Sequence, residues 1–128
     1  MKQLVLLTSL LIWSFAALAQ GPTITVSSKN FNEGYLLAEI MAQLLEIDGH
    51  TVERRFGLGG TLVCYEALVA GEVDVYAEYT GTLGQAILKI DDAAPSLDRL
   101  NQLLEPAGLM VLDSFGFNNT YAMAIKEA

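Results

Sequence analysis

The sequence predicts an α/β domain built around a parallel sheet. Short apolar segments typical of buried strands alternate with longer segments whose apolar residues recur at the helical period. Strands that alternate with helices through short connections form parallel sheets with right-handed crossovers. Once a leader is removed, about a hundred residues remain, which is enough for one small domain.

Three strands and two helices are expected in the first half of the chain. Asn30 and Glu33, three residues apart, are typical of an N-cap and capping box, and Asp48-Gly49 is typical of a helix end. The apolar residues that share one face of this first helix are Leu37, Ile40, Met41, Leu44 and Leu45. The strands are expected at residues 24–26, 51–55 and 73–76, and the helices at 35–47 and 62–70.

The second half of the chain begins with a helical pattern. Ser96 is a suitable cap for one of its helices, and Gly108 is a suitable terminator. A polar and aromatic connector follows at residues 113–120. The remaining expected elements are helices at 83–89 and 96–107 and strands at 109–112 and 121–125.

The N-terminus has the organisation of an export signal. Lys2 precedes an uncharged apolar run at residues 4–18, which ends in an A-x-A cleavage site at Ala19. This run is shorter than the roughly 20 apolar residues that span a bilayer. We therefore expect residues 1–19 to be a signal peptide and the mature protein to be periplasmic or otherwise extracytoplasmic, without stable membrane insertion.

Charge and composition exclude several classes of function. The formal net charge is −8, and it becomes −9 when the leader takes Lys2 with it. Such acidity disfavours nucleic acid and anionic membranes as partners. The single cysteine, Cys64, permits no internal disulfide and is expected to be buried on a helix. With only His50 beside it, no metal-ligand set is available, so no metal or cofactor is expected.

The motifs that would indicate an enzyme or a nucleotide site are incomplete. Residues 57–60, Gly-Leu-Gly-Gly, lie between a strand and a helix, but Leu62 stands where a dinucleotide fingerprint has its third glycine. The serines lack both a G-x-S-x-G setting and a suitable histidine. No residue is therefore assigned a catalytic role.

Two polar segments, residues 27–33 and 78–82, each follow a predicted strand. The carboxyl ends of neighbouring parallel strands meet at one edge of the sheet, where ligands bind. Tyr79 and Tyr121 provide electron-rich faces that can hold a quaternary ammonium. Lys29 can pair with a carboxylate on the same ligand, and the Thr82 hydroxyl can add a hydrogen bond.

Three segments in the same order resemble the substrate-binding proteins of ABC importers for glycine betaine, choline and related osmoprotectants. They are SKNFNEGY at residues 28–35, GLGGT at 57–61 and GEVDVYAEYTGT at 71–82. The resemblance implies one lobe of a type II periplasmic-binding-protein fold, with a mixed, mostly parallel sheet. Residues 20–112 would form the first lobe, and 113–128 would cross into a second lobe that is largely missing, since family members are over twice as long.

The resemblance also implies a set of binding residues. Lys29 and Thr82 would contact the ligand carboxylate, while Tyr79 and Tyr121 would be walls of the aromatic cage. Ala77 departs from the proline that usually precedes this motif's glutamate. The implied partners are a small quaternary-ammonium ligand and the permease and ATPase subunits of an importer. Alternatives are a regulatory ligand-binding domain of the same fold, a binding protein for another small polar solute, or an enzyme of unknown type.

Overall fold

A three-stranded parallel sheet lies at the centre of the computed structural model, which describes residues 21–92, 94–119, 124 and 126. The strand order is β2-β1-β3, and β1 pairs in parallel with both neighbours. The strands are β1 (Ile24–Lys29), β2 (Val52–Gly59) and β3 (Val75–Tyr76). The predicted parallel α/β class is therefore confirmed for the described strands.

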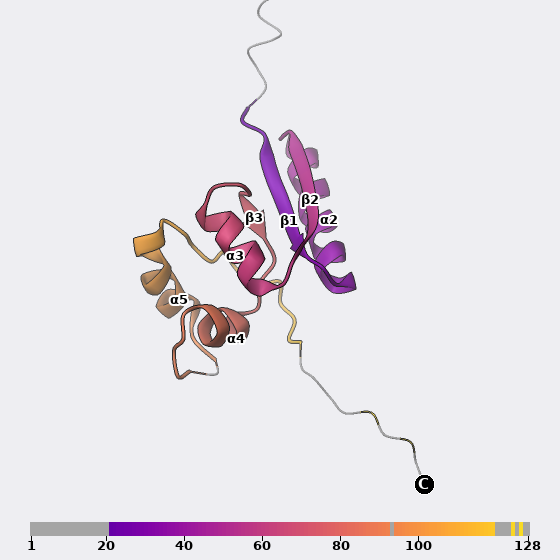
Figure 1. Cartoon of the computed structure of the whole chain (residues 1–128). Helices are drawn as coiled ribbons and strands as arrows, with labels where there is room; N and C mark the ends of the chain where they lie inside the picture. Colours follow the sequence, from indigo (N-terminus) through magenta and orange to yellow (C-terminus); the bar gives the residue numbers. More distant parts are fainter. Residues whose placement is uncertain (1–20, 93, 120–123, 125, 127–128) are drawn as a thin grey trace, which may run out of the picture.

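Two helices cover opposite faces of this sheet (Figure 1). Helix α2 (Asn32–Ile47) connects β1 to β2, and α3 (Thr61–Val69) connects β2 to β3 on the other side of β1. The order of the strands thus reverses at β1. In open α/β sheets, ligands bind beyond the carboxyl ends of the strands at such a reversal, which here means the ends of β1 and β3.

The remaining elements lie beside α3. The short helix α4 (Thr80–Thr82) continues into a π-helical turn, Leu83–Ile87, and α5 (Leu97–Leu104) ends in a 3₁₀ turn, Glu105–Ala107. Two predicted boundaries are confirmed. Ser96 caps α5 by accepting a hydrogen bond from the Arg99 amide at 3.2 Å, and Gly108 adopts the left-handed conformation, with φ of 69°.

The apolar side chains form two separate clusters. The first lies between α2 and the sheet, around Val26, Ala38 and Ala42. The second lies between Tyr65 of α3, the π-helical turn and α5, around Leu83, Leu100 and Leu104. The first cluster includes Val75 of β3, and the second includes Leu83, so the segment after β3 connects the two clusters.

The predicted apolar face of α2 is partly wrong. Ile40 and Leu44 are 45% and 60% exposed. The side of α2 that faces the sheet instead carries the small residues Gly34, Ala38 and Ala42. A Cβ added to Gly34 would lie 3.0 Å from the Lys29 carbonyl oxygen, so close approach to β1 selects the small side chains.

The predicted capping box of α2 is also absent. Phe31, not Asn30, is the N-cap, and no side chain caps this end. The Asn30 amide, which a capping box would use, donates to the Gly59 carbonyl at 3.0 Å. This bond exists because β2 extends to Gly59, through residues that the sequence predicts as a loop.

Two expected strands differ because side chains take some of the backbone hydrogen bonds that a strand would make. The strand expected at 73–76 shortens to Val75–Tyr76, and the Asp74 carboxylate accepts the Thr25 amide at 2.6 Å. The strand expected at 109–112 does not form. There the Asn101 amide group bonds the backbone N–H and C=O of Val111 at 2.6 and 3.1 Å, as a neighbouring strand would.

Cys64 is fully buried on α3, as expected, and burial raises the pKa of its thiol.

Other predictions fall outside the described residues. The signal peptide at 1–19 and Tyr121 lie outside the described residues. Among the helices of the described residues, none has the length and apolar composition that crossing a membrane requires.

Candidate functional site

Lys29, the last residue of β1, lies almost fully buried at the carboxyl end of the sheet, with 6% of its surface exposed. Its Nζ lies 2.5 Å from Glu78 Oε1 and 3.3 Å from Thr61 Oγ1. Glu78 follows β3, and Thr61 is the first residue of α3. A buried ammonium requires such a partner, because desolvation penalises an unpaired charge. The ion pair thus connects β1 to the segment after β3.

Glu78 also fixes the backbone of the residue that follows it. Its Oε1 accepts the Tyr79 amide at 2.9 Å in addition to the Lys29 ammonium. Its Oε2 is buried without a hydrogen-bond partner in the part of the chain that the structure describes. Burial, and then the nearby charge of Glu78, raise the pKa of the Tyr76 hydroxyl above its ordinary value, so Tyr76 stays neutral.

The Tyr79 ring lies among charged and aromatic groups. Lys29 Nζ is 5.1 Å from the centroid of the Tyr79 ring and 5.8 Å from that of Phe31, both within cation–π range. The Tyr79 hydroxyl donates to Glu33 Oε1 at 2.6 Å. Burial, followed by this hydrogen bond, raises the pKa of Tyr79. The phenol therefore remains a protonated donor at neutral pH.

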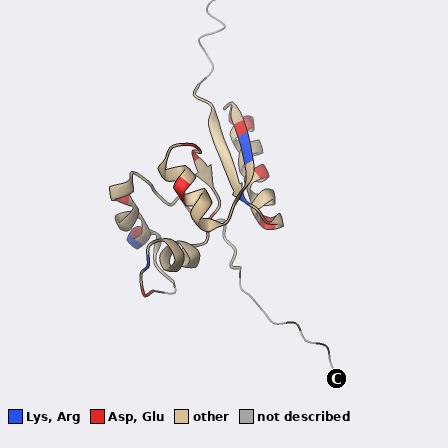
Figure 2. Ribbon diagram, in the orientation of Figure 1, with Lys and Arg blue, Asp and Glu red and all other residues tan. Residues whose placement is uncertain are grey.

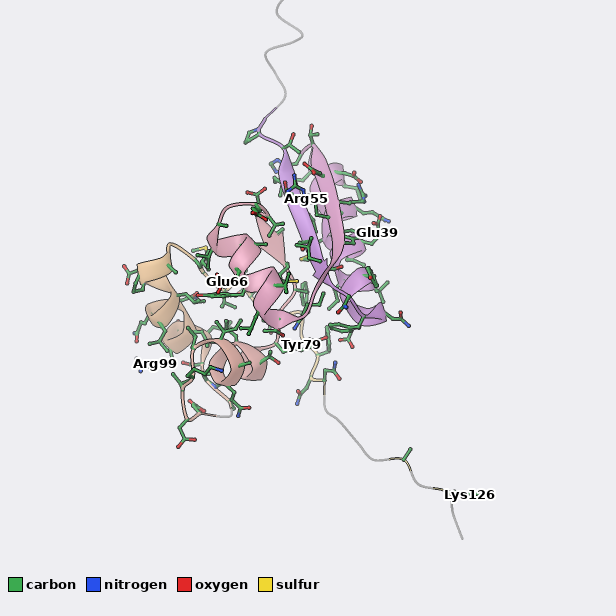
Figure 3. The ribbon with its side chains drawn as sticks, viewed as in Figure 1. Glu39, Arg55, Glu66, Tyr79, Arg99 and Lys126 are labelled. Carbon is green, nitrogen blue, oxygen red and sulfur yellow. The ribbon has the colours of Figure 1, made fainter. Side chains whose placement is uncertain are left out.

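Glu33 links Tyr79 to the segment after α5. Glu33 lies in the first turn of α2, and its second oxygen accepts the side-chain amide of Asn119 at 2.9 Å. Asn119 also lies 3.4 Å from the Tyr79 hydroxyl oxygen. Figure 3 shows Tyr79 below the sheet, between α4 and the segment that follows α5. Three segments that are distant in sequence thus meet at one phenol.

The structure brings together two of the four residues predicted for the site. Lys29 and Tyr79 are neighbours at the ends of β1 and β3. Thr82 is the last residue of α4, one turn after Tyr79, and is half-buried. Tyr121 lies outside the described residues.

Sequence reasoning missed several residues that contact Lys29 or Tyr79. The sequence pattern predicts Glu33 as a capping residue and assigns Glu78 no contact. Both follow a strand within the same polar segments that contain Lys29 and Tyr79, and that position was the available signal. Their pairing with specific partners depends on distances that the sequence does not contain. The missed contact residues are Phe31, Glu33, Thr61, Glu78 and Asn119.

The charges around the site favour binding of a cation rather than an anion. Lys29 and Glu78 offset each other, while Glu33 adds a carboxylate that bonds only to neutral donors among the described residues. Figure 2 shows acidic residues spread over the helices and few basic ones. Within the same described ranges, no group of three or more His, Cys, Asp and Glu side chains could hold a metal ion.

Known proteins resemble this chain over most of its length. Residues 22–128 match the family model described as "Substrate binding domain of ABC-type glycine betaine transport system" (OpuAC). A glycine-betaine-binding protein of Pseudomonas aeruginosa is 42% identical over 115 residues, which cover 88% of this chain and 37% of that protein. The ergothioneine transport permease/ergothioneine binding protein EgtU of Helicobacter pylori is 36% identical over 107 residues, which cover 81% and 19%.

A solved structure shares the fold. The structure of apo YehZ from Escherichia coli superposes with a TM-score of 0.53 at 34% sequence identity. The match covers 68% of this chain and 30% of the YehZ chain. The described sheet and helices therefore form part of a periplasmic-binding-protein fold. The matching family is one of transport proteins rather than enzymes. Because the family model matches residues 22–128, the chain belongs to the family of substrate-binding domains of ABC-type glycine betaine transport systems.

Proposed function

We propose that this chain contributes to the extracytoplasmic solute-binding component of an ABC importer and binds a quaternary-ammonium osmolyte such as glycine betaine or choline. The chain spans 37% of the length of the Pseudomonas aeruginosa relative, so the importer function concerns the whole protein. Its partners would be the permease and ATPase subunits. The protein would capture and deliver its ligand without chemical change.

The observation that carries this proposal is the Tyr79 ring. The ring already has an ammonium, that of Lys29, 5.1 Å from its centroid. A quaternary ammonium cannot donate a hydrogen bond, so the face of an electron-rich ring is the partner that its chemistry requires. We place the ligand ammonium on the face of Tyr79 that is turned away from Lys29, with Tyr121 as a second wall of the cage.

Lys29 and Thr82 remain the proposed contacts for a ligand carboxylate. The ammonium of Lys29 has a carboxylate partner in Glu78, so a ligand carboxylate would have to share it rather than meet a free charge. Thr82 lies one turn after Tyr79 and is half-buried, which suits a hydroxyl that donates to the same ligand.

Replacing Tyr79 separates the role of its ring from that of its hydroxyl. We expect Tyr79→Ala to weaken binding of glycine betaine or choline by about 1 to 2 kcal/mol, or roughly five- to thirtyfold, because the cation–π contact is lost. Tyr79→Phe keeps the ring and should cost less. Calorimetry measures both, in a hybrid protein in which the remainder of the Pseudomonas aeruginosa relative continues this chain.

A matched control for Tyr79→Ala is Tyr35→Ala. Tyr35 is 40% exposed, and its hydroxyl packs against Gly57 rather than Lys29. Tyr35→Ala should leave the dissociation constant for glycine betaine or choline within about twofold of the unsubstituted value. Equal losses from Tyr79→Ala and Tyr79→Phe would contradict the cage and assign the effect to the hydroxyl.

Export is tested by the mature N-terminus. We expect cleavage after Ala19, because the A-x-A site ends a short apolar run. Mass spectrometry of protein from the extracytoplasmic fraction should find Gln20, free or cyclised, as the first residue. Recovery of Met1 in the membrane fraction would instead show that the apolar run is retained as an anchor.

Ergothioneine is a second candidate ligand, since one relative is named as an ergothioneine binding protein. The same hybrid protein can be titrated with glycine betaine, choline and ergothioneine. A preference for ergothioneine of tenfold or more would move the chain to another ligand class within the same transport role. Consumption of any of these ligands by the protein would instead support an enzyme.

A further inference from the structure

Glu33 is a carboxylate that neither the predicted site nor the helix capping pattern uses. Both of its oxygens are directed to the site: one accepts the Tyr79 hydroxyl at 2.6 Å, and the other the Asn119 amide at 2.9 Å. In the part of the chain that the structure describes, no Lys or Arg forms an ion pair with it. Among the described residues its charge is therefore stabilised by two neutral donors, the phenol of Tyr79 and the amide of Asn119.

A hydrogen bond from a phenol to a carboxylate changes the ring as well as the oxygen. The ionised acceptor draws the proton away from the phenolic oxygen, and the electron density left behind spreads into the ring. Cation–π attraction is electrostatic and grows with the negative charge of the ring face. We propose that Glu33 positions the Tyr79 ring and raises its affinity for a quaternary ammonium through this hydrogen bond.

The surrounding charges support this role. Lys29 and Glu78 form an ion pair and offset each other, so Glu33 contributes the excess negative charge beside the ring. Burial and the bond to Glu33 raise the pKa of Tyr79 and keep its hydroxyl protonated. A phenolate, in contrast, could not donate and would repel Glu33. Asn119 holds the other oxygen of Glu33 and so limits the directions that this carboxylate can take.

The first test measures the hydrogen bond without any ligand. Glu33→Gln keeps an oxygen that can accept the phenol but removes the charge. We expect the pKa of Tyr79, followed by ¹³C NMR of the labelled tyrosine ring carbon in the purified chain, to fall towards its ordinary value, because one of the causes that raise it is lost. Tyr79→Phe assigns the resonance. An unchanged pKa would overturn the inference.

The second test measures the ring face, and here the inference rests on the proposed function. Tetramethylammonium is the probe, because it carries no carboxylate or hydroxyl and reports only the ammonium contact. In NMR titrations of the hybrid protein described above, Glu33→Gln should weaken binding of tetramethylammonium roughly three- to tenfold. In a Tyr79→Phe background, the same substitution should change binding by less than about twofold, because the phenol that transmits the effect is gone.

The control is Glu39→Gln, which removes the same charge from the same helix. Glu39 pairs with Arg54 and lies away from Tyr79 (Figure 3). Glu39→Gln should leave both the Tyr79 pKa and the tetramethylammonium affinity unchanged. If Glu33→Gln weakens tetramethylammonium binding equally with and without the Tyr79 hydroxyl, the inference is wrong. The charge of Glu33 would then act on the ligand directly through space. Absence of tetramethylammonium binding by the unsubstituted hybrid protein would count against the proposed function itself.

Discussion

Glu78→Gln is expected to lower the free energy of unfolding by about 3 to 5 kcal/mol, because it leaves the ammonium of Lys29 buried without a counter-charge. The side chains of Lys29 and Glu78 are only 7% and 10% exposed, so water cannot replace the lost carboxylate. The substitution keeps the shape of the side chain and an acceptor for the Tyr79 amide. The loss, measured by chemical denaturation, therefore reports charge rather than packing.

Two further variants define the effect of Glu78→Gln. Glu53→Gln breaks an exposed ion pair, in which the side chains of Glu53 and Arg55 are 48% and 45% exposed. It should lower the free energy of unfolding by less than about 1 kcal/mol. Replacing both members of the buried pair, as Lys29→Met with Glu78→Leu, should restore much of the stability, since an apolar pair needs no compensation. A loss below about 1 kcal/mol for Glu78→Gln would show that the pair is open to solvent.

This ion pair affects how any Lys29 variant is interpreted. If Lys29 only contacts a ligand carboxylate, Lys29→Ala weakens glycine betaine more than choline and leaves stability unchanged. Because Lys29 is buried against Glu78, we expect Lys29→Ala also to remove the counter-charge of Glu78. The support that Glu78 gives to the Tyr79 backbone would be lost with it. Loss of both ligands together with loss of stability would therefore indicate a structural role for Lys29.

The sequence was sufficient for the order of the strands and helices from β1 to α5 and for the proximity of Lys29 and Tyr79. Apolar periodicity identified α2, α3 and α5, and turn residues such as Ser96 and Gly108 marked their ends. The rule that carboxyl ends of parallel strands meet brought Lys29 and Tyr79 together, and the structure places them 5.1 Å apart. These features depend on local pattern, which a single sequence contains.

The predictions that are wrong concern backbone groups whose hydrogen-bond partners lie elsewhere in the sequence. Asn30 was expected to cap α2, but its amide bonds to Gly59, which the strand pairing of β2 brings alongside. The strand expected at 109–112 is replaced by contacts with the Asn101 side chain. The partners of Glu33 and Glu78 lie 46 and 49 residues away in sequence, so a local pattern cannot identify them.

Leu100→Ala is expected to destabilise the second apolar cluster by about 2 to 5 kcal/mol. Leu100 is fully buried and packs with Leu83 and Leu104, so truncation removes apolar contacts and leaves a cavity. The matched control is Leu112→Ala. Leu112 is 67% exposed, and its truncation should change the free energy of unfolding by about 0.5 kcal/mol or less. Chemical denaturation compares the two.

The consequence for the site follows from the connection between Leu83 and Tyr79. The Leu83 amide donates to the Tyr79 carbonyl at 2.8 Å, so the turn that presents Tyr79 is anchored on this cluster. Leu100→Ala should therefore loosen the Tyr79 phenol and bring its pKa closer to the ordinary value, because burial is the main cause that raises it. A large loss of stability with an unchanged Tyr79 pKa would show that α5 supports the fold but not the site.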